Sequence, residues 1–518
     1  MNEFEGFLSD IVEFINEVRG QARQERYQLY ANEIFKYYIS YGGKAVLEHL
    51  KNALNDDLEL YSLVLFTLYT ITESPDCIYY LYDLVQKNDI DIFACLDIYM
   101  NIQIIKFQNY KVKISYEMHR KIHKHLLERI QNELDMSMKF LPYKERNRKR
   151  ILLATDTLLS EYHAPSRIVY LIIRTLCNLG YEVAIVVNVQ MYDFQRRMQY
   201  CLTPYWKNYN RKYNFQSVLE YEGKKIPIHQ MLFSEQTINE QKKLFDYVYQ
   251  WKPMFVWMIG ASEPIQDLYR NIVTQISMGC TDGYPFSESP VLASYMQSGS
   301  EYVKESVEYA KRQKQKLLNF DLDIKYQREN WKMTRKDLGI PERKFVLCIV
   351  GNRLDTEISI EFKEMLNDLL EIDHRFYIVL IGKCKNNLLK EFDSKRYKLL
   401  GYRKDINDVI AMTDLFINPP RQGGGGGAAR ALAVEVPVVT LPDCDVYNVV
   451  GNDFCYSDLH QMKQIIMRYL LDSDFYGDQQ EKAKRIIQQR NYNADNFEKE
   501  IKKVVDQVEE WLEKGEIQ

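Results

Sequence analysis

Five consecutive glycines, Gly423 to Gly427, lie between an apolar and an alanine-rich segment in "FINPPRQGGGGGAARALAVEVPVVTL". The apolar segment is typical of a strand, and the alanine-rich one of a helix. A glycine loop between a strand and a helix exposes main-chain N–H groups at the positive end of the helix dipole. Because glycine has no side chain, an anion can approach this main chain closely. The run therefore predicts a phosphate-binding loop; the alternative is a flexible surface loop.

Two common kinds of phosphate loop do not fit the sequence. A Walker loop requires Lys-Ser or Lys-Thr after the glycines, and neither follows here. A dinucleotide fingerprint follows the first strand of its domain, whereas this run follows a late one. A nucleotide diphosphate bound without a Walker lysine remains.

Three basic residues stand where strands are expected to end, and strand ends meet at the ligand-binding edge of an α/β sheet. Arg353 follows "KFVLCIV" and Arg421 precedes the glycines. We expect both to bind the diphosphate; the alternative is a structural salt bridge. Lys383 follows "FYIVLIG" and could reach the phosphate or the base, or lie on the surface.

Other residues suit proton transfer and sugar binding. His163, in the loop after the expected strand "ILLATDTLL", could act as general base or orient the donor sugar. Asp156 and Asp282 are alternative bases, and all three could instead be structural. After the last core strand, we expect contacts with sugar hydroxyls from Asp443, Asp445 and Asn448. We expect no metal at this site.

The segments around these residues predict three regions. Residues 1–145 carry apolar side chains at helical spacing, as in "AVLEHLKNAL", and read as all-helical. From Ile151, strands alternate with helices in two series, which predicts two doubly wound parallel sheets. The segment "YKERNRKR" (143–150) is expected to be a solvated hinge or, alternatively, a basic spot for anionic lipid or acceptor. Residues 301–339 are expected to form a helical connector, and the chain beyond His460 is expected to be helical and to cross both domains.

Composition excludes several classes. The 518 residues carry a net charge of −4, which argues against a nucleic-acid binder. The 9 cysteines lack CxxC spacing and predict reduced thiols. The N-terminus is unlike a signal peptide, and no apolar run approaches the ~18 residues of a membrane span. We expect a cytoplasmic protein, with peripheral membrane contact left open. His119, His123 and His125 are expected on a solvated helix face.

Four segments, in order, resemble glycosyltransferases of the GT-B family: "GYEVAIV", "RKDLGIPERKFVLCIVGNRLD", "LLGYRKDINDVIAMTDLFINPP" and "GGGGGAARALAVEVPVVTL". The resemblance covers about residues 150–490. It implies two Rossmann-like domains facing a cleft, with the nucleotide-sugar held mainly by the second. Arg353 matches an arginine that commonly meets the diphosphate. The expected domains are an accessory or acceptor-binding helical domain (1–145), an acceptor-side domain (150–325), a nucleotide-sugar domain (335–485) and a C-terminal helix (486–518).

The sequence also departs from the family. Many retaining members carry two glutamates with seven residues between them, at the positions where this chain has Gln422 and Arg430. Glu435 replaces the usual glycine at the end of the following helix. The resemblance therefore leaves open whether the enzyme retains or inverts. The helical region before the two domains resembles O-GlcNAc transferases and bacterial cytoplasmic N-glycosyltransferases.

These features predict a bacterial enzyme that moves a sugar from a nucleotide-sugar, most simply a UDP-sugar, to a protein or glycan acceptor. The resemblance implies departure of UDP without a metal, and no cofactor is expected. The helical region would bind the acceptor or a partner subunit. Two alternatives remain: a surface-polysaccharide glycosyltransferase using a lipid-linked acceptor, and a catalytically silent GT-B-like subunit that binds glycosylated protein and supports a partner transferase.

Overall fold

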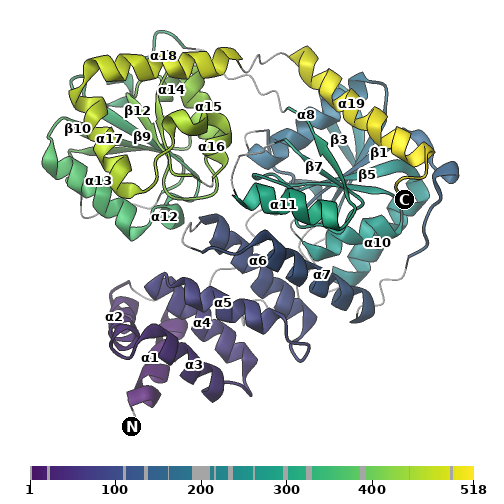
Figure 1. The fold of residues 1–518 in the computed structure, drawn as a ribbon, viewed down its shortest axis with the longest axis horizontal. Helices are drawn as coiled ribbons and strands as arrows, with labels where there is room; N and C mark the ends of the chain where they lie inside the picture. Colours follow the sequence, from purple (N-terminus) through teal and green to yellow (C-terminus); the bar gives the residue numbers. More distant parts are fainter. Residues whose placement is uncertain are drawn as a thin grey trace.

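The N-terminal region is all-helical, as expected. The computed structural model describes residues 3–19, 24–108, 112–133, 138–161, 163–188, 210–214, 217–231, 237–260, 263–295, 301–321, 330–384, 392–442, 444–489 and 494–518. The helices of this region are α1 (Glu3–Arg19), α2 (Gln24–Ser40), α3 (Gly43–Ala53), α4 (Leu58–Thr72), α5 (Pro75–Val85), α6 (Ile92–Gln108) and α7 (Tyr116–Glu133). They lie beneath two α/β units in Figure 1.

Local signals set the ends of these helices. Asp57 caps α4, since its Oδ1 accepts the N–H of Leu60 at 2.9 Å. Pro75 occupies the first turn of α5, where its missing N–H costs no hydrogen bond. In the described residues, no helix combines the length and apolarity needed to cross a bilayer.

The first α/β unit contains a sheet in the order β3-β4-β2-β1-β5-β6-β7-β8. Its neighbours pair in parallel except β3 and β4. The strands are β1 (Asn147–Thr155), β2 (Glu182–Val187), β3 (Val218–Tyr221), β4 (Lys224–Gln230), β5 (Pro253–Ile259), β6 (Gln275–Met278), β7 (Val291–Ser294) and β8 (Lys316–Asn319). The connecting helices include α8 (Ala164–Asn178), α10 (Thr237–Trp251), the 3-10 helix η4 (Pro264–Asn271) and α11 (Glu301–Arg312). The strand order changes direction between β1 and β5, where open α/β sheets bind ligands.

The second α/β unit is a parallel sheet in the order β11-β10-β9-β12-β13. Its strands are β9 (Phe345–Val350), β10 (Phe376–Ile381), β11 (Tyr397–Gly401), β12 (Leu415–Ile417) and β13 (Val438–Val439). The helices are α12 (Leu354–Glu357), α13 (Ile360–Ile372), α14 (Ile406–Ile410), α15 (Gly425–Ala433), α16 (Asp445–Val450) and α17 (Leu459–Leu471). In this sheet the strand order changes direction between β9 and β12. The predicted fold class, two Rossmann-like domains after an all-α region, is confirmed.

The C-terminal chain joins the two α/β units, as expected. Helix α18 (Ser473–Gln489) packs on the second unit, where Ala483 is fully buried. Helix α19 (Ala494–Glu513) packs on the first unit, and its residues Phe497, Ile501 and Val505 are buried in the core of that unit. Figure 1 shows α18 above one unit and α19 above the other. The predicted boundary between residues 485 and 486 falls inside α18.

Three local predictions are wrong. The segment 143–150 is no solvated hinge, because residues 147–150 begin β1 and Arg146 is buried. Arg146 donates hydrogen bonds to the main-chain oxygens of Leu141 and Met254, so its guanidinium holds segments of the protein together. The expected connector at 301–339 contains the parallel strand β8. His119 and His123 do not lie on a solvated face, because both are buried where α7 meets the first α/β unit.

Candidate functional site

The carboxyl ends of β9 and β12 carry two arginines joined by one carboxylate. Arg353 stands at the N-cap position of α12, and its Nε and Nη2 donate to Glu357 Oε1 at 3.2 and 3.1 Å. Half of its side chain remains exposed, at 50%. Arg421 is buried: its Nη1 pairs with Glu357 Oε2 and its Nη2 donates to the carbonyl of Val350 at 2.6 Å. Two guanidinium groups on one carboxylate leave a net positive charge at this edge.

The sequence indicated both arginines but missed Glu357, which stands four residues after Arg353 in "RLDTE". The i, i+4 spacing was the available signal. Arg421 also donates to Asn418 Oδ1 at 3.0 Å. Diphosphate binding by either arginine stays a prediction, and Arg421 already has three protein partners.

The glycine run is half loop and half helix. Helix α15 begins at Gly425, after Gly424 with φ +116°. A Cβ on Gly424 would lie 2.2 Å from Asn418 Oδ1, and one on Gly427 would lie 2.9 Å from the ring of Phe416. Packing within the protein therefore requires glycine at both positions, whether or not a ligand binds there. The first N–H groups of α15 have no carbonyl partner within the helix, and Gly426 is exposed among them. Phosphate binding by Gly423 to Gly427 stays a prediction that this geometry suits.

Asp445 lies where the two α/β units touch. It is buried at the start of α16, and its Oδ1 accepts the N–H of Asp282 at 3.2 Å. Burial, followed by the negative charge of Asp282, raises the pKa of Asp445 to about 8, while the Asp282 N–H and Arg421 act in the opposite direction. Asn448 lies half-buried on the same helix. Asp443 lies outside the described residues.

The first unit contributes acidic and histidine side chains. Asp156 follows β1 and is half-buried beside Gly260, where a Cβ would lie 2.9 Å from Asp156 Oδ1. This contact joins the ends of β1 and β5, at the change of strand direction. Asp282 is buried in the connection between β6 and β7.

His163 stands at the N-cap position of α8, and its Nδ1 lies 2.8 Å from Ser166 Oγ. Burial, and then the positive charge of Arg353, lowers the pKa of His163 to about 4. The imidazole is therefore neutral near pH 7. For Nε2 to accept a proton, Nδ1 must donate to Ser166 Oγ.

These interactions bring most of the predicted residues together. Arg353 acts electrostatically on His163, and Asp282 bonds to Asp445. Cys280, which the sequence did not indicate, is affected by charges from both α/β units. Burial and the charges of Asp156 and Asp445 raise its pKa. We call Asp156, His163, Asp282, Arg353, Asp445 and the start of α15 the interdomain site. Lys383 is exposed after β10, and no described contact joins it to this site.

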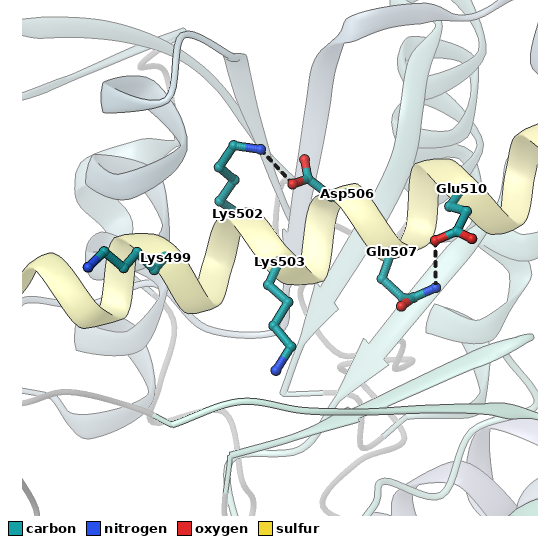
Figure 2. Close-up of a pocket in the computed structure, with 6 residues that line it drawn as sticks. All are labelled: Lys499, Lys502, Lys503, Asp506, Gln507 and Glu510. Atoms are coloured by element: carbon teal, nitrogen blue, oxygen red, sulfur yellow. Dashed lines mark hydrogen bonds and ion pairs between the residues drawn. The ribbon is translucent and has the colours of Figure 1, made fainter.

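A separate shallow hollow lies on the outer surface of α19 (Figure 2). Its lining residues are Lys499, Lys502, Lys503, Asp506, Gln507 and Glu510. Lys502 pairs with Asp506 at 2.5 Å along the helix. Because the hollow shares no residue with the interdomain site, we assign it no part in the chemistry of that site.

No family model matches the chain. A curated relative, the UDP-Gal:alpha-D-GlcNAc-diphosphoundecaprenol alpha-1,3-galactosyltransferase of Escherichia coli, is 30% identical over 131 residues. That match spans 23% of this chain and about a third of the relative, 32%.

Two solved structures are similar to larger parts of the chain. HepE of Anabaena, in complex with UDP and glucose, is 12% identical with a TM-score of 0.48, covering 69% of this chain and 99% of that one. A mutant O-GlcNAc transferase of Thermobaculum terrenum is 12% identical with a TM-score of 0.49, covering 98% of both. The protein thus resembles glycosyltransferases in sequence over a short stretch, while its own strand orders establish the two Rossmann-like domains.

Proposed function

We propose that this protein is a glycosyltransferase that moves a sugar from a UDP-sugar to a protein or glycan acceptor. The observation that carries the proposal is the charge arrangement of the interdomain site. A cationic strand edge with a helix N-terminus faces an edge with two carboxylates and a neutral imidazole. The second unit would hold an anionic leaving group, and the first would handle the acceptor proton.

The donor would bind on the second unit. Arg353 is the exposed cation there, and α15 directs its first N–H groups to the same edge. We propose that these groups hold the diphosphate and that Arg421 supports the loop from below. When the bond from sugar C1 to the diphosphate oxygen breaks, UDP leaves with the electron pair. The guanidinium of Arg353 and the helix amides would stabilise that charge.

The acceptor would approach from the first unit, where its hydroxyl or amide loses a proton as the new bond to C1 forms. His163 is neutral and can accept this proton, although a pKa of about 4 makes it a weak base. A bound diphosphate would offset the charge of Arg353 and so raise the basicity of His163. Asp156 is the alternative base, because it ends β1 at the same edge.

A lipid-linked acceptor is the second candidate, because the name of the E. coli relative gives a diphosphoundecaprenol-linked acceptor. A silent subunit is the third, because Gln422 and Arg430 stand where many retaining enzymes carry glutamates. The Arg430 side chain has a structural partner, because its Nη1 donates to Asn407 Oδ1 at 2.7 Å. At Gln422 the main-chain carbonyl accepts the N–H of Asp445 at 2.7 Å.

A UDP-release screen across several UDP-sugars tests the proposal, with and without protein and lipid-linked acceptors and in the presence of EDTA. We expect release that depends on one donor and one acceptor class and persists in EDTA. Release only with the lipid-linked acceptor would select the second candidate. Absence of turnover, with no UDP binding by calorimetry at millimolar UDP, would favour the silent subunit.

Variants show whether turnover arises at the interdomain site. His163→Ala should lower kcat, whereas His460→Ala, an exposed histidine on α17, should not. Equal activity of both variants would remove His163 from the mechanism.

A further inference from the structure

We infer that helix α7 positions the interdomain site, acting through the loop between β6 and β7, residues 279–290. We call this segment the β6–β7 loop. The inference deepens the proposed function and rests on it for the claim that the site is catalytic. The contacts themselves stand independently of any activity.

One part of the loop reaches the second α/β unit. The N–H of Asp282 donates to Asp445 Oδ1 at 3.2 Å, and both residues are buried. Gly283 follows with φ +81°, a turn that glycine adopts without strain. The loop thus touches the helix that starts beside the glycine run.

The next part of the loop is held by one face of α7. Tyr116, His119 and Arg120 follow a three- and four-residue spacing that places them on the same side of the helix. The Tyr116 hydroxyl donates to the carbonyl of Pro285 at 2.8 Å. The rings of His119 and Phe286 stack at 4.5 Å with an interplanar angle of 23°.

An ion pair completes this face, because Arg120 Nη2 lies 2.6 Å from Glu288 Oε1. Arg120 is fully buried, so separating the pair would leave a charge without its partner. The α7 contacts are therefore directional and costly to break, unlike a purely apolar packing surface.

A buried carboxylate ties this face to the sheet. Asp267 in η4 lies 2.9 Å from His123 Nε2, and its oxygens accept the Ser287 hydroxyl and the N–H of Glu288. These partners lower the pKa of Asp267 despite its burial. Helix α7, η4 and the loop therefore form one hydrogen-bonded unit.

Only a short stretch of chain separates the contact of Asp282 with Asp445 from the contact of Pro285 with Tyr116. Asp282 and Pro285 are three residues apart, with a tight turn at Gly283. A loop fixed at residues 285–288 leaves Asp282 little freedom to leave Asp445. The helical region is thus a structural part of the interdomain site.

Hydrogen exchange of the full-length protein tests this inference. Tyr116→Phe removes the hydroxyl that holds Pro285 and accepts from Arg120 at 3.4 Å. We expect about tenfold faster amide exchange in residues 279–290 and also in α16 across the interface, with β9 unchanged. Tyr79→Phe is the matched control: its hydroxyl also bonds a carbonyl in the helical region, that of Lys113 at 3.0 Å, but does not touch the loop. This control should leave both segments unchanged.

Faster exchange in the loop alone, or in neither segment, would overturn the inference. If Tyr116→Phe does not fold, Phe286→Leu removes the ring that the loop stacks on His119. Exchange in residues 279–290 and in α16 is then measured in the same way. Exchange requires no turnover, so an absence of sugar transfer would defeat the proposed function without touching this result.

In an active enzyme, Tyr116→Phe should lower kcat about tenfold with the donor KM within twofold. Its effect should be non-additive with that of Asp445→Ala, which removes the acceptor of the Asp282 N–H, because both variants act through that contact. Additive effects, or a change confined to KM, would contradict the inference.

Discussion

The two α/β units share one architecture but end their strands in opposite chemistry. At the change of strand direction in the second unit, Arg353 and Arg421 share Glu357 and leave an excess positive charge. At the equivalent place in the first unit, Asp156 follows β1 and His163 is kept neutral. The contact between Asp282 and Asp445 joins the two sides.

This difference shows that the fold alone assigns no role to a strand edge. Each sheet has one change of strand direction, and we expect the side chains there to make one edge suit an anion and the other a proton acceptor. It also separates two arginines that look alike in sequence, because one is half-exposed and the other is buried.

The largest expected effect is on stability, from Arg421→Met. This change leaves Glu357 buried with only the half-exposed Arg353 as partner, so we expect a loss of about 3–5 kcal/mol in the free energy of unfolding. Urea denaturation measures it. The double variant with Glu357→Leu should recover much of the loss, and Asp156→Asn should change stability little. Unchanged stability with lost UDP affinity would instead make Arg421 a ligand residue.

Arg353→Ala should weaken UDP binding about 30–100-fold, or roughly 2–3 kcal/mol, because a charge-assisted contact is lost. Calorimetry measures the affinity, and thermal unfolding should show little change since the side chain is half-exposed. His163→Ala is the control from the opposite side and should leave UDP affinity nearly unchanged. If both variants weakened UDP equally, the division of roles between the units would fail.

Asp445 should make stability depend on pH. Its pKa is about 8 in the fold, well above the value of an unfolded aspartate, so the folded protein retains a proton that the unfolded chain releases. The stabilisation is complete below about pH 4 and is lost as pH rises from about 4 to about 8.

Asp445→Asn should flatten this dependence, by about 2 kcal/mol between pH 5 and about pH 6.5, while keeping an oxygen for the Asp282 N–H. Urea unfolding at several pH values compares the two proteins. Parallel pH profiles would show that Asp445 is ionised in the fold.

The smallest expected effect is at Glu435, which has φ +62° after α15 where the resemblance expects glycine. Glu435→Gly should stabilise the second unit by about 0.5–1 kcal/mol, because glycine adopts this conformation without strain. Urea unfolding should detect the gain, and UDP affinity should stay the same. A loss of stability would mean that the contact of Glu435 with Lys484, at 3.8 Å, outweighs the strain.

The sequence by itself determined the classes of the regions and the strand edges at which we expect ligands to bind. Helical periodicity before residue 145 and alternating strands after it follow from local patterns of burial. The glycine run after β12 marked the N-terminus of α15. The positions of Asp156 and Arg353 directly after strands also indicated the site, because parallel strands end at the same edge.

Only the tertiary structure decided which of these residues meet and how they ionise. The burial of Arg421 on Glu357, the pairing of Asp282 with Asp445 across 163 positions of sequence and the neutral His163 depend on how separate elements pack. The buried face of α7 was likewise misread as solvated, because histidine and arginine look polar until buried carboxylates, carbonyls and aromatic rings provide partners. Periodicity records which face of an element is apolar, whereas long-range charge pairing leaves no local pattern to read.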